Sequence, residues 1–285
     1  MSNSKSFLDL KTSLGLIIAA FAFLLYAQTI SYKYVNDDVG IIKTNTYVKS
    51  GISGIPKILK TDYWDGCKWD FHDALYRPAS LVMFAIEWQF FPDNPQIGHF
   101  INVLLYAITC WLLFQLLFKI FDNKNLTIPF VCTLLFVAHP IHTEVVCNIK
   151  SRDEILCLLF GILSIFFLIS YYSNKRLGYL ILGSLFYFLS LLSKESGISF
   201  LLLIPLILYI SKDINLKSMI TVFSSLAGFT MIYLLIRYQV LLNVDYKDKI
   251  LVLLGILWEE FKITIKEQNC YSKIFCFSVT SSSCF

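Results

Sequence analysis

The stretch "LLFVAHPIHTEVVCNIKSRDE", Leu134–Glu154, starts as an apolar run and then places two histidines, one lysine, one arginine and three acids within sixteen residues. Runs of leucine, phenylalanine and valine are typical of a membrane span, whereas ionisable side chains are rare and costly within lipid. We therefore predict that the polar residues of this stretch form a site outside the membrane, in the turn between two spans.

The composition of the whole chain agrees with a membrane protein. Of its 285 residues, 56% are hydrophobic and 16% aromatic, and only 15% are charged, well below the roughly 25% of an average soluble domain. One water-soluble core cannot hide so many apolar side chains, so the sequence predicts an all-α, multi-span helical bundle. The net charge of +4 predicts no nucleic-acid partner. The eight cysteines give no disulfide prediction, because several lie inside apolar runs.

Residues 1–240 are predicted to form a polytopic membrane module with a long first external loop at about residues 33–95. About 20 apolar residues cross a bilayer as a helix. Seven runs are candidates for such spans: Leu14–Tyr32, Ile97–Phe121, Leu126–Cys147, Ile155–Tyr172, Leu177–Leu192, Gly197–Ile210 and Met219–Ile236.

Basic residues in the short loops orient these spans. Lysine and arginine collect on the cytoplasmic side, and with simple alternation one side receives all four basic groups: Lys5 and Lys11, Lys119 and Lys124, Lys175 and Arg176, Lys212 and Lys217. The first loop, the turn after Pro140 and the "SKES" segment at Ser193–Ser196 then share the opposite, non-cytoplasmic side.

Two motifs in the first loop are candidates for chemistry. "NDD", Asn36–Asp38, pairs two carboxylates, an arrangement that suits general-base work in a pocket; the alternative is two solvated loop acids. "YRP" places Arg77 before "ASLVMFAIEWQFF", which predicts an aromatic-rich helix in the membrane interface. The guanidinium of Arg77 matches phosphate oxygens, or it simply anchors the loop to lipid headgroups.

The later external segments supply further candidates. His139 and His142 are three residues apart, but Pro140 interrupts the helix and no third ligand completes the set, so we expect no metal and favour polar contacts to an anionic substrate. The remaining candidates are either part of that site or ordinary first-turn and loop residues: Glu144, Arg152, Asp153, Glu154, Lys194 and Glu195. The sequence has no phosphate-cradling glycine loop and no nucleophile elbow, which excludes the common soluble nucleotide-dependent enzymes.

Taken in order, five segments resemble one family. They are "NDD", "YRPASLVMFAIEWQF", "HFINVLLYAITCWLLF", "LLFVAHPIHTEVVCNIKSRDEILCLLF" and "LLSKESGI". They are similar to the membrane module of the transmembrane O-mannosyltransferases that act on cadherins, and to bacterial relatives that carry tetratricopeptide repeats. The resemblance covers about residues 14–210.

The resemblance implies a GT-C glycosyltransferase fold, here a partial one. It implies that a polyprenyl-phosphate sugar is the donor, that a hydroxyl of a protein or other molecule is the acceptor, and that no separate cofactor is needed. By position, Asp37 and Asp38 are the implied catalytic acids and Arg77 the implied phosphate ligand. We expect His139, His142, Arg152 and Lys194 to assist at the phosphate. The implied location is a bacterial cytoplasmic membrane, or the ER membrane in a eukaryote, with the active face non-cytoplasmic.

The sequence departs from the family pattern after Arg237. Residues 241–285 form an atypical tail, ending in a string rich in cysteine, serine and phenylalanine, and we expect it to be a truncated or frameshifted end. An inactive fragment or a non-catalytic membrane scaffold is therefore the alternative function, and a transporter is a further one.

Overall fold

The computed structural model describes residues 2–35, 37–68, 75–121, 125–211 and 216–242, and within these ranges it contains helices and connecting turns but no strand. The tail predicted at residues 241–285 lies outside the described residues apart from its first two. The same is true of Asn36, Lys124 and Lys212.

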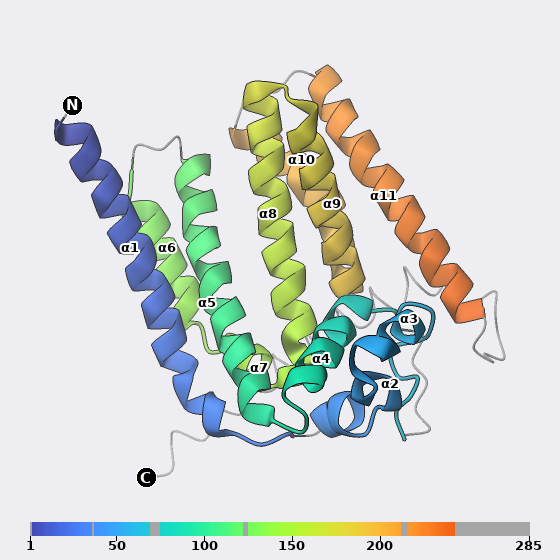
Figure 1. The fold of residues 1–285 in the computed structure, drawn as a ribbon. Helices are drawn as coiled ribbons and strands as arrows, with labels where there is room; N and C mark the ends of the chain where they lie inside the picture. The colour runs from blue at the N-terminus through green and yellow to red at the C-terminus, as the bar shows by residue number, and fades with distance from the viewer. Residues whose placement is uncertain (1, 36, 69–74, 122–124, 212–215, 243–285) are drawn as a thin grey trace, which may run out of the picture. The chain divides into compact units, whose positions relative to one another are not determined.

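Among the described residues, four helices are long and apolar enough to cross a membrane: α1 (Ser2–Tyr26, continued by η1, Ala27–Ser31), α5 (Pro95–Ile120), α8 (Arg152–Asn174, preceded by η4, Ile149–Ser151) and α11 (Leu216–Leu242). Helix α1 packs beside α5, and α5 packs beside α8 (Figure 1). The prediction of an all-α membrane bundle is confirmed.

Three shorter apolar helices occupy the other predicted runs: α6 (Thr127–Ala138), α9 (Leu177–Ser193) and α10 (Phe200–Ser211, preceded by η5, Glu195–Ser199). Helix α9 packs along α8, where Gly183 allows close approach: a Cβ at this position would lie 2.6 Å from Cγ of Leu168. Small residues at such contacts strengthen packing between helices in lipid, where burial of apolar surface gives little driving force. The count of seven membrane spans stays a prediction.

The predicted run Leu126–Cys147 is two helices rather than one. Helix α6 ends at Ala138, and the six-residue α7 (His142–Cys147) follows after a turn. The cause is Pro140, which lacks a backbone N–H and disfavours helical geometry in the residue before it. His139 accordingly has φ −70° and ψ 125°. The chain therefore turns at the point where its polar residues begin.

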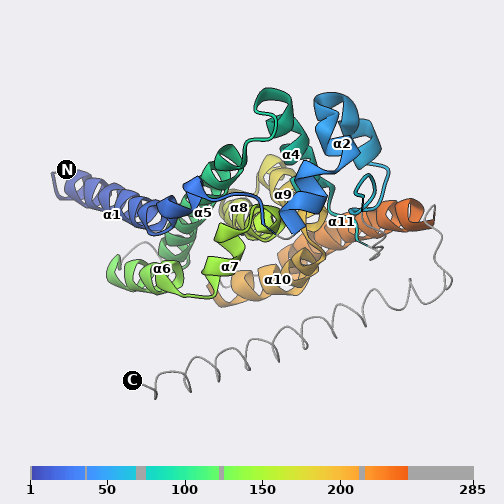
Figure 2. The ribbon, with the colours of Figure 1, turned by 90° about the horizontal axis from the view of Figure 1, so that it is seen from below.

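The first loop folds into short helices at one end of the bundle: η2 (Val39–Lys43), α2 (Thr46–Lys49), η3 (Gly51–Gly54), α3 (Ile55–Ile58) and the longer α4 (Pro78–Phe90). Asn45 begins α2 by accepting hydrogen bonds from the N–H groups of Tyr47 and Val48, at 2.9 and 3.1 Å. In the view of that end in Figure 2, the first-loop helices lie to one side of α7. The predicted helix α4 is confirmed, while its position in a membrane interface stays a prediction.

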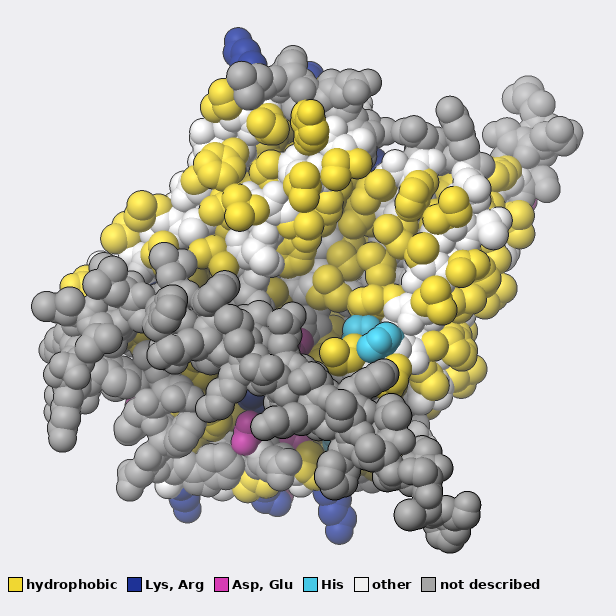
Figure 3. All heavy atoms as spheres, turned by 180° about the vertical axis from the view of Figure 1, so that it is seen from behind, with side chains coloured by type: hydrophobic (Ala, Val, Ile, Leu, Met, Phe, Trp, Pro, Cys, Tyr) yellow, Lys and Arg dark blue, Asp and Glu magenta, His cyan; other side chains and the backbone are white. Residues whose placement is uncertain are grey.

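The basic residues of the short connections gather at the other end. Lys119, in the last turn of α5, donates to Oγ of Ser170 on α8 at 2.6 Å. Lys175, just after α8, donates to Oγ of Ser218 at the start of α11 at 2.9 Å. In Figure 3, hydrophobic side chains cover most of the visible face of the helices, and charged side chains gather toward its two ends. Which end faces the cytoplasm stays a prediction.

Candidate functional site

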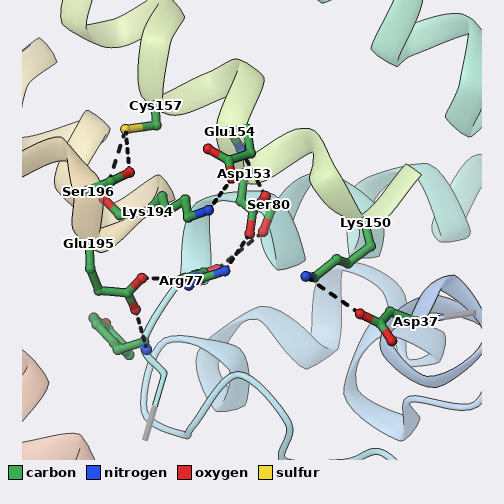
Figure 4. A network of polar contacts seen from close by, with 11 residues as sticks. Asp37, Arg77, Ser80, Lys150, Asp153, Glu154, Cys157, Lys194, Glu195 and Ser196 are labelled. Atoms are coloured by element: carbon green, nitrogen blue, oxygen red, sulfur yellow. Dashed lines mark hydrogen bonds and ion pairs between the residues drawn. The ribbon is translucent and has the colours of Figure 1, made fainter. Parts of the chain in front are cut away.

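The segment Lys150–Glu154 at the start of α8 is the centre of a network of charged groups (Figure 4). Its side chains point to different partners: Lys150 pairs with Asp37, Arg152 with Glu87, Asp153 with Arg77, and Glu154 with Lys194. One helical turn thus connects the first loop, α4 and the "SKES" segment. The cluster of charges noted in the sequence is therefore a junction of three parts of the fold.

Arg77 lies between two buried carboxylates. Its Nε donates to Oε2 of Glu195 and its Nη1 donates to Oδ2 of Asp153, both at 2.8 Å. The side chains of Asp153 and Glu195 are each 2% exposed, and that of Arg77 is 11% exposed. Burial by itself would lower the pKa of Arg77, but the two carboxylates raise it well above its usual value. Arg77 is thus a fixed cation.

Lys194 forms a more open ion pair with Glu154. The side chain of Lys194 is 17% exposed and that of Glu154 is 39% exposed. Burial acts to lower the pKa of Lys194, yet the carboxylates of Glu154 and Asp153 outweigh it and raise the pKa. Lys194 is therefore charged, and Glu154 gives this part of the network access to solvent.

The two adjacent acids of "NDD" have different environments. Asp38 is fully buried, and its carboxylate accepts hydrogen bonds from the backbone N–H of Lys150 at 2.7 Å and of Val35 at 3.2 Å. Asp37 is 42% exposed, and its Oδ2 lies 3.6 Å from Nζ of Lys150. Burial raises the pKa of Asp38, although these hydrogen bonds oppose the shift. Asp37 can therefore meet a substrate, whereas Asp38 fixes the backbone of Lys150.

Arg152 has no exposed surface. Its guanidinium donates to Glu87 on α4, to Oδ1 of Asn102 at 2.7 Å and to the carbonyl of Gly98 at 3.0 Å, and it stacks over the ring of Phe84. The sequence analysis predicts that this residue contacts the donor phosphate. In the structure it joins α4, α5 and α8, and so it holds the neighbouring Lys150 and Asp153 in register.

The histidines lie on the turn between α6 and α7. His142 packs against the ring of Phe136, with centroids 4.3 Å apart, and against Tyr106 at 5.7 Å. His139 is exposed and its Nδ1 accepts the backbone N–H of Ile141 at 3.2 Å. Glu144 is exposed in the first turn of α7. The contacts of these three residues lie within the turn and with α5 and α6 rather than with the charged network, so their part in a substrate site stays a prediction.

A metal site finds no support in the described part of the chain, where no three His, Cys, Asp or Glu side chains come together in a way that could hold an ion. Cys157, on α8, is buried, and its Sγ lies 3.3 Å from Oγ of Ser190.

Three residues in or near the network were not singled out in the sequence: Glu87, whose side chain is 15% exposed, and the buried Asn102 and Arg237. Glu87 is a lone acid in the apolar stretch of α4, and Arg237 is a lone base, 5% exposed, near the end of α11. The signal that could have found them is an isolated ionisable residue within an apolar helix, since such residues have buried partners or a function. Asn102 gives no comparable signal.

The chain is similar to several protein O-mannosyl-transferases. Human protein O-mannosyl-transferase TMTC1 is 33% identical over 147 residues, which are 50% of this chain and 16% of the human protein. Drosophila melanogaster Tmtc1 is 28% identical over 204 residues, covering 71% of this chain and 23% of the relative. Human TMTC2 is 30% identical over 197 residues, covering 65% and 23%.

The chain thus spans less than a quarter of the length of these relatives. No family model matches it. No solved structure matches it significantly. The predicted resemblance is confirmed: this chain is similar in sequence to protein O-mannosyl-transferases over half or more of its length.

Proposed function

We propose that this chain is the membrane module of a glycosyltransferase with a partial GT-C fold, which moves a sugar from a polyprenyl-phosphate donor to a hydroxyl acceptor. The names of its relatives support sugar transfer, with mannose as the sugar. The observation that carries the proposal is the single turn Lys150–Glu154. Its Lys150 pairs with the partly exposed acid Asp37, and its Asp153 pairs with Arg77. A base and an anion-binding group are the two parts that such a transfer needs.

Asp37 is the proposed general base. Its carboxylate is partly exposed, and Lys150 holds it from one side at 3.6 Å. Asp38 acts as a positioning residue, because it holds the backbone N–H of Lys150 from within the protein. This assignment gives the two adjacent acids different roles that match their different burial.

Arg77 and Lys194 are the proposed cations at the donor phosphate. Arg77 uses two of its five N–H groups for Asp153 and Glu195, and a guanidinium has three others with which to donate to a phosphate oxygen. Lys194 is partly exposed beside Glu154. His139 and His142 are proposed as peripheral contacts to the donor, with Glu144 as a supporting group.

The proposed reaction is a single displacement with inversion. The acceptor oxygen forms a bond to the anomeric carbon of the sugar while the bond from that carbon to the phosphate oxygen breaks. The electron pair of the broken bond stays on the lipid phosphate, where the cations stabilise it. The hydroxyl proton passes to the carboxylate of Asp37.

The proposed active face is the end of the bundle that holds the charged network, on the non-cytoplasmic side of a bacterial cytoplasmic membrane or an ER membrane. Membrane lipid, the lipid-linked sugar and a protein or other hydroxyl acceptor are the proposed partners. Positive-inside counting supports this orientation, because the basic connections lie at the other end.

A second candidate is a non-catalytic membrane scaffold. The observation in its favour is that Arg77, Arg152 and Lys194 are each paired with a carboxylate, so the network also serves to attach the first loop to the bundle. The two candidates differ in whether Asp37 matters for chemistry.

The test is a transfer assay in membranes that contain this chain, with labelled polyprenyl-phosphate mannose and a serine- or threonine-rich peptide as acceptor. We expect transfer by the wild type and a loss of about 10²–10⁴-fold in kcat for Asp37→Asn, the usual contribution of a general base. Asp93→Asn is the matched control, because Asp93 is an acid of the same loop with 53% exposure. No transfer by the wild type would favour the scaffold, and full activity of Asp37→Asn would remove this base assignment.

A further inference from the structure

Helix α11 is joined to α9 by side-chain hydrogen bonds along one face. Oγ of Ser225 lies 2.8 Å from Oγ of Ser184, and Oγ1 of Thr230 lies 2.7 Å from the hydroxyl of Tyr187. The Thr230 hydroxyl is also bonded to the carbonyl of Leu226 one turn back. Hydrogen bonds of this kind stabilise contacts between helices within a membrane, so they set which face of α11 meets the bundle.

The same face of α11 continues to the first loop. Tyr233 is 1% exposed, and its ring packs against the ring of Tyr76 with centroids 6.5 Å apart. Tyr76 directly precedes Arg77, and its backbone N–H donates to Oε1 of Glu195 at 3.4 Å. One aromatic contact thus brings α11 next to the carboxylate that holds Arg77.

Arg237 lies one helical turn beyond Tyr233, on the same face. It is 5% exposed and belongs to a helix that is apolar enough to cross a membrane. Burial raises the pKa of Glu195, but the charges of Arg77 and Arg237 outweigh this effect and lower it. Glu195 therefore has arginine charges acting on it from both the first loop and α11.

The charge of the cluster shows why this arginine matters for an anionic ligand. Without Arg237, the cations Arg77 and Lys194 face three acids, Asp153, Glu154 and Glu195, and the group carries one net negative charge. Such a group would repel a phosphate. The charge of Arg237 makes the cluster neutral, so that the N–H groups of Arg77 not used for Asp153 and Glu195 can attract a phosphate oxygen.

We propose that Arg237 is a second arginine of the donor-phosphate site and contacts the phosphate together with Arg77. This inference rests on the proposed function, since it assigns a further residue to the same donor. It also gives α11 a direct part in substrate binding. The simpler role, a counter-ion that only neutralises Glu195, makes a different prediction for variants that keep the charge balanced.

The experiment measures binding of a polyprenyl monophosphate and of the uncharged polyprenol of equal length to the purified full chain in detergent. We expect Arg237→Gln to weaken binding of the phosphate about tenfold to hundredfold, the loss that follows from one charge-assisted hydrogen bond, and to leave polyprenol binding unchanged. Arg176→Gln is the control, because Arg176 is exposed and lies at the opposite end of the bundle.

The double variant Arg237→Gln/Glu195→Gln separates the contact from the charge. It removes one cation and one anion, so the net charge of the cluster is that of the wild type. We expect it to bind the phosphate as weakly as the single variant; wild-type affinity in the double variant would overturn the proposal in favour of the counter-ion role. A wild type that binds polyprenol as tightly as its phosphate would instead contradict the proposed function itself.

Discussion

The carboxylate of Asp38 accepts a hydrogen bond from the backbone N–H of Lys150 at 2.7 Å, across 112 residues of sequence. This bond joins the start of the first loop to the start of α8. Asp38 is adjacent to Asp37, and Lys150 lies three residues before Asp153. The positions of Asp37 and of the Arg77–Asp153 ion pair therefore depend on the same buried contact.

The first prediction concerns the stability that this contact provides. In Asp38→Asn, the amide oxygen can accept the N–H of Lys150, but the amide nitrogen then faces the N–H of Val35, which now donates to Asp38 at 3.2 Å. The amide N–H groups of the asparagine, at a position with no exposed surface, are left without an acceptor, so we expect a loss of about 1–3 kcal/mol in the free energy of unfolding. Denaturant unfolding of the detergent-solubilised chain measures it.

The pH dependence of that loss has a definite sign. Burial raises the pKa of Asp38 above the usual value of 3.8, so the folded state binds this proton more tightly than the unfolded state does. The stability of the wild type relative to Asp38→Asn should therefore decrease as the pH rises from about 4 through the raised pKa, and be constant above it. If the stability of the wild type relative to Asp38→Asn increased over this pH range, the hydrogen bonds to Asp38 would outweigh burial and would lower its pKa.

The second prediction concerns Arg77. Arg77→Ala would leave the carboxylates of Asp153 and Glu195, each 2% exposed, without their shared cation. We expect a loss of about 3–5 kcal/mol in stability, typical of breaking a buried ion pair from one side. The triple variant Arg77→Met/Asp153→Asn/Glu195→Gln should recover most of it.

Lys43→Met is the control for this comparison. Lys43 and Asp93 form an ion pair in the same loop, but their side chains are 47% and 53% exposed, and exposed pairs contribute at most about 1 kcal/mol. Equal losses for Lys43→Met and Arg77→Ala would show that burial of the Arg77 pairs has no energetic consequence.

Much of the fold could be predicted because its signals are local. Each of the seven apolar runs contains a helix, and Pro140 marks the turn that ends α6. Alternation of the spans also placed the first loop, the α7 turn and the "SKES" segment at one end, and the contacts of Lys150 and Lys194 agree. These features follow from hydropathy and backbone chemistry within a few residues.

The pairing inside the site could not be predicted in the same way. Arg77 pairs with Asp153 and Glu195, which are 76 and 118 residues away in the sequence. Arg152 pairs with Glu87, which is 65 residues away. These partners depend on how the helices are rotated and how far each extends, which apolar spacing does not fix. For this reason the sequence analysis predicts Arg152 as a phosphate contact, whereas in the structure the packed helices enclose its side chain.

The third prediction is the orientation in the membrane. Positive-inside counting predicts that Arg176 is cytoplasmic and that Lys60, exposed in the first loop, is on the other side. In a cysteine-depleted chain in intact cells or sealed vesicles, a membrane-impermeant maleimide should label Lys60→Cys from outside and leave Arg176→Cys unlabelled until the membrane is opened. The reverse labelling pattern would place the charged network at the cytoplasmic face and would contradict the proposed non-cytoplasmic active face.

The last prediction concerns the packing of α8 against α10. A Cβ at Gly161 would lie 2.1 Å from Cζ of Phe200, and the other ring atoms nearby are within 2.6 Å. Phe200 is 7% exposed and begins α10 directly after the segment that carries Glu195. Because the ring has little room to move, Gly161→Ala should push α10 away, with a loss of about 1–3 kcal/mol in stability.

Gly178→Ala is the matched control, since nothing lies within 4 Å of a Cβ at that position in α9. There we expect no loss, and a gain of up to about 1 kcal/mol from the higher helix propensity of alanine. Thermal unfolding of both variants measures the difference, and Phe200→Leu combined with Gly161→Ala should recover part of the loss by freeing space for the methyl group. If Gly161→Ala were as stable as Gly178→Ala, α8 and α10 could not be packed as closely as the structure has them, and the position of Glu195 beside Arg77 would lose that support.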